Sequence, residues 1–154
     1  MIFLILSIIV PIIVWTVFPL FVGWLSGRSI QRNSTLALAC FCYFISWQLP
    51  SPLIHGVNTS FTTHLIGGGV FCGLLWLYVQ QQLHLKLSWM LELITLYGFV
   101  SAFGVANELF ELATVEFHLT RLSGADTWWD LFANTLGALL FWIVYKLLGK
   151  MKKA

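Results

Sequence analysis

Acidic and amide side chains recur at helical spacing in the last third of this chain. Asp126, Asp130 and Asn134 are four residues apart in the stretch "DTWWDLFANTLGALLFW". Residues separated by four lie along one face of an α-helix, so these three side chains form a stripe about two turns long. Asp126 also fits a helix N-cap, where a carboxylate accepts from free backbone amides. The stripe predicts either a polar pocket or a hydrogen-bonded contact between helices.

A second polar group lies upstream in "NELFELATVEF". Asn107, Glu108 and Glu111 can project from neighbouring positions of one helical turn, because they are three or four residues apart. His64 opens an earlier apolar stretch, "THLIGGGVFCGLL". Five of the six acidic residues of the chain lie between Glu108 and Asp130. This concentration indicates one site rather than a scattered acidic surface.

Imidazole and carboxylate groups together can hold a divalent cation such as Mg²⁺, Mn²⁺ or Zn²⁺, and such a cation would bridge to the phosphate oxygens of a lipid headgroup. The candidate ligands are His64, Glu108, Glu111 and Asp130. Without a metal, crowding would favour protonation of one carboxyl and make it a candidate proton donor. We expect Asn134 to orient Asp130 or to accept a hydrogen bond from a water in the site. Arg121, in the outer loop, is a further candidate that could bind anionic headgroups.

The composition places these residues in a membrane protein. The chain has 154 residues, of which 59% are hydrophobic and 9% charged, too few polar side chains to cover a soluble globule. The net charge of +2 comes from scattered basic residues and a lysine-rich end, which excludes a nucleic-acid-binding face.

Charged and turn residues divide the chain into five apolar segments. A helix needs roughly 20 apolar residues to cross a bilayer, and this length is the standard for each segment. We predict an all-α polytopic bundle, a single domain over residues 1–154. The expected spans are Phe3–Leu25, Thr35–Leu49, His64–Val79, Trp89–Leu112 and Trp128–Leu148. The second is short and closed by Pro50 and Pro52, so it is either extended by residues upstream or partly re-entrant. Pro11 and Pro19 should kink the first helix without ending it.

Lysine and arginine predict the orientation of the bundle. Seven basic residues fall on one side of the expected spans, and only Arg121 falls on the other. By the positive-inside rule the amino terminus is outside and the carboxyl terminus cytoplasmic. The polar side chains then lie at outer-leaflet depth, where a carboxylate should face the bundle interior or a wet cavity.

Small residues at intervals of four predict where helices touch, because they let two backbones approach in lipid. Gly69 and Gly73 make such a pair in the third span, and the fifth carries two adjacent small residues, Gly137 and Ala138. The fourth span carries a similar stripe, formed by Gly98, Ala102 and Ala106.

The stretches "NELFELATVEF" and "RLSGADTWWDLFANTLGALLF" together resemble the VanZ-like family. Asp130, Asn134 and Gly137 match its Asp-x-x-x-Asn-x-x-Gly element, Glu108 or Glu111 matches its glutamate, and His64 resembles its histidine-led span. YjdF-type inner-membrane proteins share this layout. The resemblance implies a setting in the bacterial cytoplasmic membrane and the cell envelope, and implies no reaction.

Three functions stay open at this point. An outward-facing pocket could bind an anionic lipid or a lipid-linked envelope component. The same pocket could instead serve a metal-assisted enzyme that hydrolyses or transfers a lipid headgroup. Alternatively the polar stripe could join helices in a structural or assembly subunit.

Overall fold

The computed structural model describes residues 2–54, 57–117 and 127–151. These residues form helices apart from one antiparallel pair of two-residue strands, in which Leu53 pairs with Asn58. In chain order the elements are α1 (Ile2–Ser26), α2 (Ser34–Ser46), β1 (Leu53–Ile54), β2 (Val57–Asn58), α3 (Phe61–Thr63), η1 (His64–Val70), α4 (Phe71–Gln82), α5 (Trp89–Glu116) and α6 (Thr127–Met151). The predicted helical class is confirmed, with this small hairpin added.

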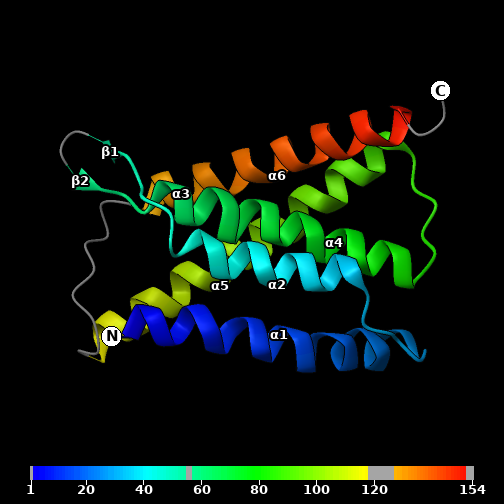
Figure 1. The fold of residues 1–154 in the computed structure, drawn as a ribbon, viewed down its shortest axis with the longest axis horizontal. Helices are drawn as coiled ribbons and strands as arrows, with labels where there is room; N and C mark the ends of the chain where they lie inside the picture. Colours follow the sequence, from blue (N-terminus) through cyan, green and yellow to red (C-terminus); the bar gives the residue numbers. More distant parts are fainter. Residues whose placement is uncertain (1, 55–56, 118–126, 152–154) are drawn as a thin grey trace.

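Four helices are long and apolar enough to cross a membrane, so the chain is a multi-pass membrane protein. They cover Leu4–Ser26, Phe61–Gln82, Trp89–Glu116 and Thr127–Gly149. The second expected span is short, as predicted, because α2 has 13 residues and reaches only about 20 Å at 1.5 Å per residue. Figure 1 nevertheless shows α2 running back between α1 and α4, so consecutive helices alternate in direction. The two termini therefore lie at opposite ends of the bundle.

α1 continues through both of its prolines, as predicted. Pro19 has no N–H, so the carbonyl of Trp15, four residues earlier, lacks its helical donor. Arg32 Nε donates to that carbonyl at 2.9 Å, and the guanidinium lies 5.9 Å from the Trp15 ring centroid. The segment between α1 and α2 thus supplies the hydrogen bond that the proline removes.

The segment from α3 through η1 to α4 is the centre of the bundle. Buried positions make up 56% of this span, against 22% or less in the other three. It begins three residues before the expected His64, with the single turn α3, and continues as a π-helix over "HLIGGGV". A π-helix is wider than an α-helix and is uncommon outside functional or strained sites. Glycines in it bring the backbone of η1 against α6.

The contact between η1 and α6 confirms the predicted glycine interface. A Cβ on Gly69 would lie 2.4 Å from the backbone oxygen of Asn134, and one on Gly137 would lie 2.0 Å from that of Leu65. One turn further along, Gly73 faces the ring of Phe141. Only glycine allows backbones to meet this closely.

The expected small-residue stripe of the fourth span is wrong. Ala102 and Ala106 are exposed on α5, and a Cβ on Gly98 would meet nothing within 4 Å. Gly104 is the glycine of α5 that faces α6, since a Cβ added to it would lie 3.3 Å from Asn134 Nδ2 and 3.4 Å from Leu131 Cδ2. Spacing of small residues alone did not distinguish the face of α5 toward the bundle from the face toward lipid.

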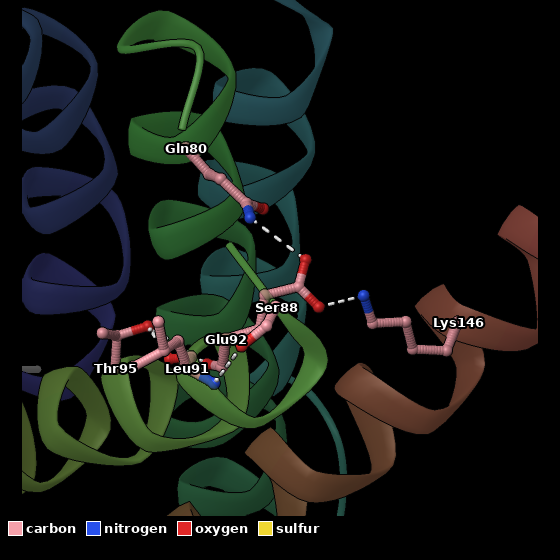
Figure 2. Close-up of polar contacts among 6 residues, drawn as sticks. All are labelled: Gln80, Ser88, Leu91, Glu92, Thr95 and Lys146. Carbon is pink, nitrogen blue, oxygen red and sulfur yellow. Dashed lines mark hydrogen bonds and ion pairs between the residues drawn. The ribbon is translucent and has the colours of Figure 1, made fainter. Parts of the chain in front are cut away.

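A buried charged cluster joins three helices at the end of the bundle where α4 ends and α5 begins. Figure 2 shows the Glu92 carboxylate on α5 between the amide of Gln80 on α4 and the ammonium of Lys146 on α6. Gln80 Nε2 donates to Glu92 Oε1 at 3.1 Å, and Lys146 Nζ forms an ion pair with Oε2. Glu92 is 5% exposed, so this pair replaces the water that its charge would otherwise require.

Candidate functional site

His64 is positioned by a short segment that ties α2 to the central helix. Ser60 precedes this helix with φ of 53°, and its carbonyl accepts from the His64 amide at 3.1 Å. Thr62 Oγ1 donates to the carbonyl of Pro50 at 2.9 Å, and Thr63 Oγ1 donates to that of Ser46 at 3.4 Å. These bonds hold the first turn against the end of α2, so the imidazole of His64 lies at a defined helix end.

Asp130 lies in the first turn of α6 and points into the bundle. Its side chain is 2% exposed, and its Oδ2 lies 3.3 Å from His64 Nε2. Trp128, two residues earlier, is 79% exposed. The prediction that Asp130 faces the interior is confirmed.

Glu111, near the end of α5, completes a three-helix cluster. His64, Glu111 and Asp130 each offer one ligand atom, and these atoms lie within 4.8 Å of one another. Glu111 Oε1 accepts from Asn107 Nδ2 at 2.7 Å, one turn back on α5. Of the candidate residues, the structure therefore brings together His64, Glu111 and Asp130, with Asn107 holding one carboxylate.

The remaining candidates are Glu108, Asp126, Arg121 and Asn134. Glu108 is partly buried on α5, one turn before Glu111, and lies outside this set of ligand atoms. A separation of its carboxylate from that of Asp130 within about 8 Å, near enough for a shared cation or bridging water, stays a prediction. Asp126 and Arg121 lie outside the described residues.

Asn134 lies one turn deeper on α6 than Asp130 and is 4% exposed. Its Nδ2 faces Gly104 on α5, and its Oδ1 lies where a Cβ of Gly68 would be. Within the described ranges, no hydrogen bond reaches this buried Oδ1. A buried amide oxygen without a donor is costly, so it is a ready acceptor for a water or a ligand N–H or O–H.

The donor set fits a divalent cation. One imidazole and two carboxylates are ligands of Zn²⁺ and Mn²⁺, and adjacent ligands of a bound ion are separated by roughly 3 to 3.5 Å. The present separation of up to 4.8 Å needs closure by roughly 1.3 to 1.8 Å, a movement that rotation of the carboxylate side chains allows. Two carboxylates in a poorly hydrated position also repel each other, and a cation removes that repulsion.

Comparison of the chain with protein-family models, with curated proteins and with solved structures gave no match. The chemistry of the site therefore follows from its side chains and their positions. The sequence indicated its members through type and spacing. It did not indicate that His64 contacts Asp130 directly, or that Gly68 and Gly104 enclose Asn134, because these contacts join different helices.

Proposed function

We propose that this protein binds a divalent cation at His64, Glu111 and Asp130, and through it an anionic lipid headgroup or a lipid-linked envelope component. The convergence of three ligand atoms within 4.8 Å, from three helices, is the observation that carries the proposal. A cluster of carboxylates alone would repel a phosphate. A bound cation with open coordination positions would attract the phosphate. This favours lipid binding through a cation over lipid binding by the carboxylates alone.

The resemblance of the last two helices to VanZ-like proteins adds the setting to this proposal. In that setting the protein lies in the bacterial cytoplasmic membrane with its amino terminus outside, and the site opens toward the envelope. The seven-to-one distribution of basic residues supports the orientation. The exposed Trp128 supports a depth near the headgroups, within reach of a lipid phosphate.

A second candidate is an enzyme that uses this cluster to hydrolyse or transfer a lipid headgroup. The contact of 3.3 Å between His64 Nε2 and Asp130 Oδ2 favours it, because a carboxylate beside an imidazole orients the ring for proton transfer. Binding and catalysis differ in whether a headgroup product is released. Chromatography of lipids after incubation with the purified protein and Mn²⁺ separates these two functions.

Binding of Mn²⁺ to the purified protein in nanodiscs tests the cation site. Electron paramagnetic resonance measures the free ion, so the bound number per chain and the Kd follow directly. We expect one ion per chain and a Kd raised at least about tenfold by Asp130→Asn or Glu111→Gln, the loss of one charged ligand. Glu116→Gln is the matched control, since Glu116 is an exposed carboxylate on the same helix.

Short-chain phosphatidylglycerol and phosphatidylcholine test the second half of the proposal. A ligand that completes the coordination of the ion must raise its affinity, because linkage between two ligands is reciprocal. We expect phosphatidylglycerol to lower the Kd for Mn²⁺ in the parent protein. Absence of Mn²⁺ binding would reject the cation site. Asp130→Asn would then lower only the stability of the fold, as expected if the polar stripe joins helices in a structural subunit.

A further inference from the structure

The turn after α1 brings Arg28 onto the end of α4, at the opposite end of the bundle from His64. Gly27 has φ of +63°, and the Arg28 amide donates to the carbonyl of Gly23 at 3.2 Å. This is the usual way in which a glycine in the left-handed region ends a helix. The Arg28 guanidinium then donates through Nη1 to the carbonyl of Leu83 at 3.3 Å. The side chain is exposed and held in one place.

An apolar groove of about 230 Å³ begins beside this arginine. It lies between the second half of α1, the end of α4 and the middle of α5. Its lining includes Phe18, Val22, Ser26, Leu83, Phe99 and Phe103. Leu83 is the residue that Arg28 contacts, and Ser26 is two residues before Arg28, so the guanidinium lies at the rim of the groove.

The mouth of the groove faces outward from the bundle. Phe21, Leu25 and Phe103 line it and are 49%, 63% and 41% exposed. Because α1 and α5 are both candidate membrane spans, this opening faces hydrocarbon, and water does not fill it. The volume holds part of one hydrocarbon chain and is too apolar for a headgroup.

The charge at the rim is not neutralised within the described part of the chain. Arg28 has no carboxylate within ion-pair distance there, since Glu92 is paired with Lys146 and the other described acidic residues lie toward the far end of α5 and the start of α6. The carbonyl ends of α1 and α4 offset part of this charge. Lys86, also exposed, lies in the segment that follows α4 and is not among the residues that line the groove.

We propose that this groove binds one acyl chain of an anionic phospholipid whose phosphate lies on Arg28. A guanidinium has five N–H donors, and only one of them is used by Leu83. The remaining donors suit phosphate oxygens, and a chain descending from that phosphate enters the groove. This site is independent of the cation site, because Arg28 follows the end of α1, which lies at the opposite end of the bundle from η1 (Figure 1), and the groove shares no lining residue with the cation cluster.

Native mass spectrometry of the full chain, released from nanodiscs of equal phosphatidylglycerol and phosphatidylcholine with identical chains, tests this site. We expect one retained lipid per chain, enriched in phosphatidylglycerol. Arg28→Gln should lower the ratio of phosphatidylglycerol to phosphatidylcholine roughly tenfold, through loss of a charge-assisted contact. Lys86→Gln removes the same charge from the same end and should leave the ratio unchanged.

Two further variants keep the test decisive if Arg28→Gln does not fold. Arg28→Lys keeps the charge and should keep the enrichment. Val79→Phe fills the groove with an aromatic ring and should remove retention of both lipids, since Val79 lines it. An equal loss with Lys86→Gln, or full retention in folded Val79→Phe, overturns the proposal. Asp130→Asn should leave retention intact, whatever its effect on Mn²⁺.

Discussion

Replacement of Gly69 by alanine tests whether the η1 and α6 backbones meet as closely as the structure shows. The added Cβ would lie 2.4 Å from the oxygen of Asn134, 2.6 Å from the Cα of Gly137 and 2.7 Å from the nitrogen of Ala138. All three atoms belong to the α6 backbone, so no side-chain rotation relieves the overlap. The helices must separate by about 1 Å to restore ordinary contact distances.

The expected cost follows from two opposing effects. Overpacking in a filled interior costs about 1–3 kcal/mol, and rigid backbone places this substitution at the upper end. Alanine recovers up to about 1 kcal/mol through its better helix propensity. The net loss in the free energy of unfolding is therefore about 2 kcal/mol. The same separation would move Asp130 away from His64, whose nitrogen lies 3.3 Å from its carboxylate, and should weaken Mn²⁺ binding.

Gly98→Ala is the matched control for Gly69→Ala. Gly98 lies in α5 with nothing within 4 Å of its added Cβ, so alanine there should raise stability by about 0.5–1 kcal/mol. Both free energies of unfolding can be measured in mixed micelles, by circular dichroism at increasing mole fractions of sodium dodecyl sulfate. Equal stabilities for the two variants would show that η1 and α6 do not meet at Gly69, and would remove the basis for placing His64 beside Asp130.

Further predictions concern the other end of the bundle and its orientation. Glu92→Gln should lower the free energy of unfolding by about 1–3 kcal/mol, because it leaves the partly buried Lys146 without its partner. Adding Lys146→Met to the same chain should recover most of that loss, as measured by the same micelle assay. Gly27→Ala should cost about 1–2 kcal/mol through its φ of +63° alone, since nothing lies within 4 Å of the added Cβ; an unchanged stability would argue against that turn. A cysteine at Asn58 should react with an impermeant maleimide in intact cells and one at Lys86 should not, and the reverse pattern would place the cation site in the cytoplasm.

The members of the candidate site were predictable because membranes penalise charge. In a chain with so few charged residues, an acidic side chain within an apolar helix must have a polar neighbour, and helical spacing then groups Glu108 with Glu111 and Asp130 with Asn134. The direct contact of His64 with Asp130, and the choice of Glu111 over Glu108 for the three-atom cluster, were not predictable. They depend on the rotation of each helix about its axis, which weak amphipathicity in lipid does not define.

The membrane class, the approximate helix limits and the glycine contact of the third and last spans were predictable, since each depends on local composition or on spacing along one helix. Two features depend on contacts between helices: Gly104, and not the stripe of Gly98, faces the bundle, and Glu92 meets Lys146. A π-helix also replaces the α-helical turn expected after His64. These features arise from packing between segments far apart in the chain, where the free energy depends on which surfaces meet and local propensity contributes little.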